Sequence, residues 1–399
     1  MKISQRALQI SPSLTLALTA KSKKLKEEGV DVVSFGAGEP DFNTPSYIIE
    51  SAKRALDEGK TKYTPASGTV EIKKAICDKL QKDNHLTYAP ENIVVSNGAK
   101  HSLANVFMAI VEEGDEVIVP TPYWLTYPEL ITLAGGKPIF VETKEENGFK
   151  ITADELRRAI THKTVALVLN NPNNPTGAVY SKEEIYALAK VVEESGITVV
   201  SDEIYEMLNY TGKEIVSIAS YSEKVKAQTI IVNGVSKSYA MTGWRIGFIA
   251  CEAKVAKAIS NMQSHMTSNP NSIAQVATVT AYCSSEGEKF LETMLASFSS
   301  RRALIMEKLT ENGFEFIRPD GAFYALVKVS QLFGKKYNGK QINTAHELAS
   351  TLLDEKAVTV IPCESFGASE YVRLSYAISE DDIVKGVDRM GEFAKAMED

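Results

Sequence analysis

The stretch TIIVNGVSKSYAMTGWR, residues 229–245, joins an apolar run to two polar clusters. Thr229–Val232 is rich in β-branched residues and is therefore predicted to be a strand. Lys237 follows it between two serines, and the residues MTGWR close the stretch at 241–245. A lysine between two serines is usually a solvent-exposed residue with no specific role. Only the residues that lie near it in space can indicate a function for it.

Two more polar clusters follow apolar runs upstream. Residues 171–177 (NPNNPTG) come after the run Val165–Leu169, and residues 202–205 (DEIY) come after the run Thr198–Ser201. The carboxyl ends of neighbouring parallel strands meet at one edge of a sheet, where ligands bind in open α/β folds. The three clusters are therefore predicted to meet at one site.

The chain alternates short β-rich runs with longer amphipathic stretches up to about residue 290. The candidate strands are Ile93–Ser96, Glu116–Val119, Pro138–Val141, Val165–Leu169, Thr198–Ser201, Thr229–Val232 and Gly247–Ala250. The helical patterns between them are Ala99–Glu112, Tyr127–Ala134, Ala153–Ile160 and Lys182–Glu194. Strands joined by crossover helices predict an α/β fold with a mostly parallel sheet covered on both faces.

After about residue 290 the pattern changes to that of a smaller α+β unit. Its predicted elements are helix Phe290–Asn312, a strand in Ala322–Lys328, helix Thr344–Glu355, strands near Val358–Ile361 and Tyr371–Leu374, and helix Glu380–Met397. The first 45 residues precede the regular alternation and are expected to pack with this unit. The sequence thus predicts a large domain over residues 46–290 and a small domain made of residues 1–45 and 291–399.

Composition and missing motifs argue against several classes of function. The 399 residues carry a net charge of −7, which argues against nucleic-acid and membrane partners. No apolar run reaches the ~18 residues of a membrane span, and the N-terminal pattern predicts no signal peptide. Four widely spaced cysteines are typical of a reduced cytoplasmic protein. The five histidines lack metal-ligand spacing, and the phosphate-loop and GxGxxG motifs are missing, so no metal is expected.

In order and together, the three clusters resemble the fold-type I, class I aminotransferases, which depend on pyridoxal-5′-phosphate. Asp202 and Lys237 lie 35 residues apart, and Arg245 follows Lys237 by 8. The chain is similar to the bacterial aspartate aminotransferases of subgroup Ib from GEPDF at residues 38–42 to YVRLSY at residues 371–376. The resemblance implies that family's fold, cofactor and two-domain organisation.

The resemblance also implies three catalytic residues, Lys237, Asp202 and Tyr205. Lys237 matches the lysine that holds the cofactor as a Schiff base and later moves a proton between the substrate Cα and the cofactor. Asp202 matches the carboxylate that keeps the pyridine nitrogen protonated, which makes the ring an electron sink. Tyr205 and Asn174 match donors to the cofactor 3′-oxygen. Trp124 matches the aromatic residue that stacks on the ring, and both Trp124 and Asn174 are expected to border the substrate.

The cofactor phosphate is expected at the start of a predicted helix. The residues implied as its ligands are Arg245, Ser236 and the backbone amides of Gly98, Ala99 and Lys100, with Ser238 as a candidate neighbour.

Substrate binding is implied at the C-terminal strand and at the subunit interface. Arg373 matches the arginine that grips the substrate α-carboxylate with a bidentate fork, and Gly38 is expected to offer a backbone amide to it. Tyr63 matches a tyrosine that reaches the cofactor from a partner subunit, so a homodimer is implied.

An acidic substrate is implied by a second set of residues. In subgroup Ib a lysine and two hydroxyl residues near the N-terminus bind the distal carboxylate, and Lys100, Ser13 and Thr15 match them. Ser11 stands where some members that accept prephenate carry a basic residue, which counts against prephenate.

The main hypothesis is transamination between aspartate and 2-oxoglutarate by a ping-pong mechanism, in which the cofactor alternates between pyridoxal and pyridoxamine phosphate. Aromatic, kynurenine-type and prephenate specificities are the alternatives within the family. A lyase on the same fold would eliminate a leaving group without needing a keto-acid acceptor. A non-catalytic regulator would carry an added DNA-binding segment, for which 399 residues leave no room.

Overall fold

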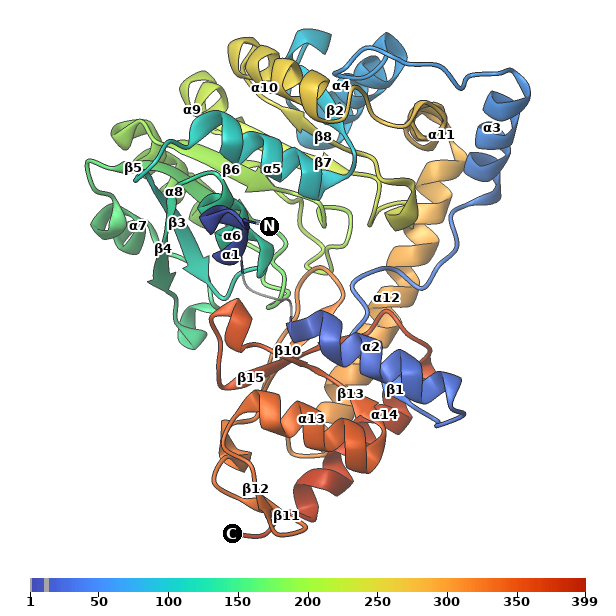
Figure 1. Ribbon diagram of the computed structural model, residues 1–399, viewed down its shortest axis with the longest axis vertical. Coiled ribbons are helices and arrows are strands. Elements are labelled where there is room, and N and C mark those ends of the chain that lie inside the picture. Colours follow the sequence, from blue (N-terminus) through green and yellow to red (C-terminus); the bar gives the residue numbers. More distant parts are fainter. Residues whose placement is uncertain (1, 11–13) are drawn as a thin grey trace.

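In the computed structural model, the central feature is one seven-stranded sheet (Figure 1). The structure describes the backbone of residues 2–10 and 14–399 and the side chains of residues 2–10 and 18–399. The strand order is β2 (Ile93–Ser96), β8 (Gly247–Ala250), β7 (Thr229–Gly234), β6 (Thr198–Asp202), β5 (Thr164–Asn170), β3 (Glu116–Thr121) and β4 (Lys137–Glu142). Of these seven, β8 alone runs against the others, because it pairs antiparallel with both β2 and β7. The predicted mostly parallel sheet is confirmed.

The strands read as continuous apolar runs because both faces of the sheet are buried. In β5, Ala166 and Val168 pack into a cluster on one face, while Leu167 and Leu169 pack into a cluster on the other. Successive side chains of a strand point to opposite faces, so a sheet covered on both sides needs apolar residues at every position.

Helices cover the two faces. One face is covered by α5 (Ala99–Ile110), α6 (Thr126–Leu133) and α10 (Ala253–Met266). The other is covered by α3 (Ser46–Asp57), α4 (Val70–Asn84), α7 (Ala153–Ala159), α8 (Lys182–Ser195), α9 (Glu223–Gln228) and α11 (Ser272–Cys283). The four predicted helices of this region correspond to α5, α6, α7 and α8, with ends within two residues of the prediction. In the described part of the chain, no helix is long and apolar enough to cross a membrane.

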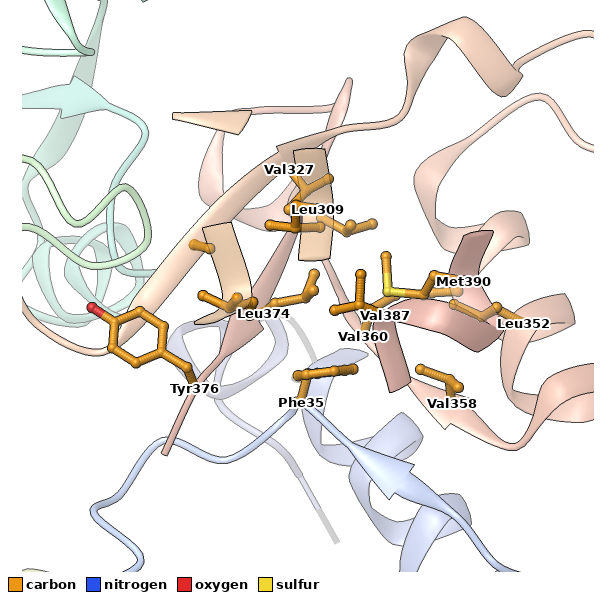
Figure 2. Close-up of a cluster of buried hydrophobic side chains, with 14 of the residues drawn as sticks. Phe35, Leu309, Val327, Leu352, Val358, Val360, Leu374, Tyr376, Val387 and Met390 are labelled. Atoms are coloured by element: carbon orange, nitrogen blue, oxygen red, sulfur yellow. The ribbon is translucent and has the colours of Figure 1, made fainter. Parts of the chain in front are cut away.

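A long helix, α12 (Glu286–Glu311), leads from this sheet to a smaller one (Figure 1). The smaller sheet is antiparallel and has the order β14 (Ile361–Pro362), β15 (Tyr371–Ser375), β10 (Tyr324–Lys328) and β9 (Phe316–Ile317). The remaining elements of this part are α13 (Ala345–Lys356), α14 (Glu380–Lys395) and a hairpin of β11 (Lys336–Tyr337) and β12 (Lys340–Gln341). Figure 2 shows the core that unites it, where Leu309, Val327, Leu374 and Met390 come from four different elements.

The predicted strand near Val358–Ile361 is divided between two sheets. Its first half, β13 (Val358–Thr359), pairs in parallel with β1 (Val33–Ser34), and its second half, β14, pairs with β15. Phe35 directly follows β1 and is buried in the core of the smaller part (Figure 2). An early segment of the chain therefore completes the C-terminal fold.

The two N-terminal helices lie on different parts of the molecule. α2 (Leu14–Glu27) lies beside β13 and β14, whereas α1 (Gln5–Leu8) lies against α6 of the large part. The chain thus passes from the large part to the small part within its first 27 residues.

The carboxyl ends of the parallel strands meet at one edge of the large sheet. The strand register sets Asn170 beside Asp202 and Asp202 beside Val232. Because β8 runs in the opposite direction, its first residue, Gly247, lies at the same edge. A Cβ added to Gly247 would come within 2.2 Å of the Ala99 nitrogen, so β8 and the start of α5 are in close contact there.

Candidate active site

A cavity of about 490 Å³ lies at this edge, lined by residues of both parts of the chain. The predicted site residues that line it are Gly38, Ala99, Lys100, Trp124, Asn174, Asp202, Tyr205, Ser236, Lys237, Arg245 and Arg373. Residues from the loops after β1, β3, β5, β6 and β7 and from both sheets are thus brought to one place.

Lys237 follows β7 and enters the cavity half-buried. Its ammonium donates a hydrogen bond to the Gly38 carbonyl. The pKa of Lys237 is lowered to about 8, chiefly by burial; Arg373 and Arg245 contribute to the fall, and Glu39 and Asp202 oppose it. The amine therefore gives up its proton more readily than a surface lysine does.

Asp202 ends β6 and is only 3% exposed. Its Oδ2 accepts a hydrogen bond from the Tyr127 hydroxyl at 2.7 Å, and its Oδ1 accepts one from the Ile204 N–H at 3.3 Å. Burial raises the pKa of Asp202 to about 6, while these two donors and the Lys237 ammonium oppose the rise. At neutral pH the site thus keeps a buried anion.

Arg373, on β15, and Tyr205, in the loop after β6, are linked through Tyr324. The Tyr205 and Tyr324 hydroxyls are 3.0 Å apart, and the Arg373 guanidinium lies 4.3 Å from the centre of the Tyr324 ring. Arg373 Nη1 donates to Asn174 Oδ1 at 2.9 Å. Its Nε is buried and has no hydrogen-bond partner among the described residues. Such a donor suits an incoming carboxylate, since a buried unpaired donor is costly.

Arg245 lies over the N-terminus of α5. Gly98 precedes this helix with φ of 93° and provides no side-chain cap. A Cβ on Gly98 would come within 2.3 Å of the Arg245 guanidinium, so this close approach requires glycine. The guanidinium donates to the carbonyls of Thr242 at 2.7 Å and Asn97 at 3.5 Å. An arginine beside the unpaired amides of a helix start is an anion-binding arrangement.

Lys100 lies in the first turn of α5, with its ammonium 4.9 Å from the centre of the Trp124 ring. Burial and the nearby Arg245 lower the pKa of Lys100. Among the described lining residues, the cations Lys100, Lys237, Arg245 and Arg373 outnumber the carboxylates Glu39 and Asp202. The cavity therefore favours a ligand that carries several negative charges.

Three expected residues with described side chains or backbone, Gly98, Ser238 and Tyr63, are not among those lining the cavity. Ser238 is buried and its hydroxyl donates to the Gly234 carbonyl at 3.5 Å. Tyr63 is 89% exposed on the loop before α4. Ser13 and the side chain of Thr15 lie outside the described residues.

Sequence reasoning missed several polar residues of the cavity, among them Tyr127, Asn170 and Tyr324. Asn170 ends β5, and its side chain accepts a hydrogen bond from the Asn174 N–H at 2.9 Å. Its position directly before the cluster at residues 171–177 was a usable signal. Tyr127 and Tyr324 stand in apolar patterns, which gave no sign that their hydroxyls face the site.

The sequence pattern described as aminotransferase class I and II matches residues 30–390 of this chain. The chain belongs to the class I and II aminotransferases. An aspartate aminotransferase of Bacillus subtilis (strain 168) is 48% identical over 99% of both chains. A probable aspartate/prephenate aminotransferase of Aquifex aeolicus (strain VF5) is 44% identical, over 100% of this chain and 99% of that one. The structure of the Thermus thermophilus aspartate aminotransferase with maleate has a TM-score of 0.93 at 42% identity, over 98% of this chain and 100% of that one.

The cofactor of this aminotransferase is pyridoxal-5′-phosphate. The residues present fit the group. The guanidinium of Arg245 and the open start of α5 suit a phosphate, and the buried carboxylate of Asp202 suits a protonated pyridine nitrogen. The amine of Lys237 suits an aldehyde, because its lowered pKa leaves part of it neutral.

Proposed function

We propose that this enzyme transfers amino groups between L-aspartate and 2-oxoglutarate in two half-reactions. One observation carries the proposal: Arg373 and Lys100 line the same cavity as Lys237. Two separate cations suit the two carboxylates of an acidic amino acid, and the amine of Lys237 in the same cavity suits the reaction. The names of the relatives support the same substrate.

Bound pyridoxal-5′-phosphate supplies the electron sink and carries the amino group between the two substrates. Arg245, Ser236 and the amides of Gly98, Ala99 and Lys100 are proposed to hold its phosphate. Tyr205 and Asn174 would donate to its 3′-oxygen, Trp124 would stack on its ring, and Asp202 would face its nitrogen.

The substrate is proposed to be held at both ends. Arg373 binds the α-carboxylate through Nε and an Nη nitrogen, and the Gly38 amide adds a donor. Lys100 binds the distal carboxylate, and Ser13 and Thr15 are proposed as further donors to it. The neutral Nζ of Lys237 would take the proton from the substrate Cα and pass it to the cofactor, and would carry it back in the reverse half-reaction.

Steady-state kinetics test this proposal. With L-aspartate and 2-oxoglutarate, the purified enzyme should form oxaloacetate and glutamate, and no keto acid should accumulate beyond one turnover without the acceptor. L-Phenylalanine and L-kynurenine should react more slowly. Steady production of ammonia without an acceptor would instead indicate a lyase.

Prephenate is a second candidate substrate, because relatives at 41–44% identity are named aspartate/prephenate aminotransferases. Position 11, which bears on this choice, lies outside the described residues. Measuring kcat/KM for prephenate with aspartate or glutamate as donor, against that for 2-oxoglutarate with the same donor, decides between the two specificities.

A homodimer with shared active sites is part of the proposal. Tyr63 is highly exposed, yet two buried glutamines fix its loop. Gln275 accepts from the Thr69 N–H at 2.9 Å and donates to the Thr64 hydroxyl at 3.0 Å, and Gln263 donates to the Ala66 carbonyl at 2.6 Å. A rigidly presented aromatic ring suits insertion into a second copy.

Subunit complementation tests the shared site. Tyr63→Leu and Lys237→Ala chains should each be impaired alone. When they are co-expressed, half of the sites in the mixed dimers combine an intact Tyr63 with an intact Lys237, so about a quarter of wild-type activity should return. No recovery, or a monomer in light scattering, would contradict the dimer.

A cytoplasmic location is the last part of the proposal. The four cysteines are free in the structure, and three of them are buried. Unpaired thiols suit a reducing compartment. Cell fractionation tests this, and recovery of the enzyme outside the cytoplasm would contradict it.

A further inference from the structure

Tyr127 is a buried tyrosine whose hydroxyl faces the active site. It lies in the first turn of α6 and is 2% exposed. Its hydroxyl donates to Asp202 Oδ2 at 2.7 Å. A phenol has one hydrogen to donate, and here a buried carboxylate receives it.

Few other interactions stabilise the ionised form of Asp202. Its second oxygen accepts a longer bond, 3.3 Å, from the Ile204 N–H. The titratable groups that act on the pKa of Asp202 are Tyr127 on α6 and Lys237 after β7, and Asp202 itself raises the pKa of Tyr205 in the loop after β6. Burial is the largest influence on the pKa of Asp202 and raises it, and the Tyr127 hydrogen bond is the strongest influence against that rise.

Tyr127 also contacts Trp124. The two rings pack edge to face, with centres 5.4 Å apart and planes at 84°. The Tyr127 N–H donates to the Trp124 carbonyl at 3.0 Å, which closes the turn between β3 and α6. Tyr127 therefore touches Asp202 at the end of β6 and Trp124 in the loop after β3, which are both proposed to contact the cofactor ring.

We propose that Tyr127 is a positioning residue that keeps Asp202 ionised and turned toward the cofactor nitrogen. A hydroxyl that donates to a carboxylate stabilises the ionised form and restricts its rotation. The role rests on the proposed function, because Asp202 is taken there as the partner of the pyridine nitrogen. It goes beyond that function, because Tyr127 itself need not touch cofactor or substrate.

The chain offers a matched control in Tyr180. This tyrosine is also buried, but its hydroxyl accepts the Ile151 N–H at 3.0 Å and is not among the residues that line the cavity. Tyr127→Phe and Tyr180→Phe each keep a ring in place and remove one buried hydroxyl. A loss of stability alone should therefore affect both variants, whereas an effect through Asp202 should appear only in Tyr127→Phe.

The experiment measures the dissociation constant of pyridoxal-5′-phosphate across a range of pH. In Tyr127→Phe, affinity at neutral pH should fall about tenfold, the loss expected for one hydrogen bond to a charged group. The pH below which affinity declines should move upward, because Asp202 without this donor takes up a proton more easily. Tyr180→Phe should match the wild type in both respects.

A double-mutant cycle with Asp202→Asn separates positioning from a general structural effect. Tyr127→Phe should cost little further affinity once the carboxylate is gone. Unchanged affinity and pH dependence in Tyr127→Phe, equal losses in both Phe variants, or fully additive losses with Asp202→Asn would each overturn the role. Failure of the wild type to use aspartate would contradict only the proposed substrate, since cofactor affinity is measured without substrate.

Discussion

Arg373 and Asn174 meet across the cavity, where Arg373 Nη1 donates to Asn174 Oδ1 at 2.9 Å. Arg373 belongs to β15 of the small sheet, and Asn174 lies in the loop after β5 of the large sheet. The bond thus joins the residue proposed to grip the substrate to one proposed to contact the cofactor. Both side chains are buried, so either would be left unsatisfied without the other.

Replacing Arg373 by lysine should weaken substrate binding more than it weakens folding. Lysine keeps the charge but cannot use Nε and Nη together, so at least one hydrogen bond to the α-carboxylate is lost. The value of kcat/KM for aspartate should fall between about tenfold and a hundredfold, since such a bond contributes about 1.5–3 kcal/mol. Steady-state kinetics of Arg373→Lys provide the measurement. A value equal to that of the wild type would show that Arg373 does not bind substrate.

Lys100→Ser should change specificity rather than abolish catalysis. The ammonium near Trp124 is proposed to pair with the distal carboxylate alone. The KM for aspartate should rise at least about tenfold, while kcat/KM for L-phenylalanine should stay the same or increase. Lys257→Ser, on the exposed side of α10, is the control and should behave as the wild type. Equal losses on both amino acids would contradict the assignment.

The lowered pKa of Lys237 predicts a pH dependence for cofactor capture. Only the neutral amine attacks an aldehyde, and burial lowers the pKa of this lysine to about 8. The rate at which the apoenzyme takes up pyridoxal-5′-phosphate should rise with pH below about 8 and level off above it. Stopped-flow absorbance can follow the rate. A rise that continues to about pH 10, as for an ordinary lysine, would contradict the buried environment.

Glu203 predicts a pH dependence of stability that is independent of catalysis. It is buried behind Asp202, and its Oε1 accepts hydrogen bonds from Ser201 at 2.8 Å and Ser217 at 2.6 Å. Burial raises the pKa of Glu203 to about 7, Glu206 adds to the rise, and the serine donors oppose it. Between its unfolded value near 4.5 and this value, the native state binds more protons than the unfolded state. The free energy of unfolding must then fall as pH rises through this window, by at most about 1.4 kcal/mol per pH unit.

Glu203→Gln removes that titration. The melting temperature of the apoenzyme should be measured between about pH 5 and 8. It should fall more steeply with rising pH in the wild type than in the variant. Glu292→Gln, at an exposed position of α12, should keep the wild-type slope. The same slope in Glu203→Gln would mean that Glu203 is ionised throughout this range.

The positions of Asp202 and Lys237 could be predicted from the sequence for a simple reason. Each follows a run of apolar β-branched residues, and parallel strands bring their carboxyl ends to one edge. The same rule placed Asn174 and Trp124 near that edge, whereas the roles of these residues toward the cofactor were implied by the family resemblance.

Hydroxyl partners and strand directions were not predictable in this way. Tyr127 donates to a carboxylate 75 residues further along the chain, and Tyr205 meets Tyr324 across 119 residues. When a tyrosine stands in an apolar pattern, the sequence predicts only that it is buried in the hydrophobic core. A four-residue run such as β8 carries no direction, and the run around Val358 does not show that its halves join different sheets.

An absorbance titration of the enzyme loaded with pyridoxal-5′-phosphate tests the central claim most directly. L-Aspartate alone should convert the band of the aldehyde form of the cofactor into that of the amine form, and 2-oxoglutarate should restore it. Lys237→Ala should fold but show neither change. If L-aspartate leaves the spectrum unchanged while an aromatic amino acid converts it, the assignment of Lys100 to the distal carboxylate of an acidic substrate is wrong.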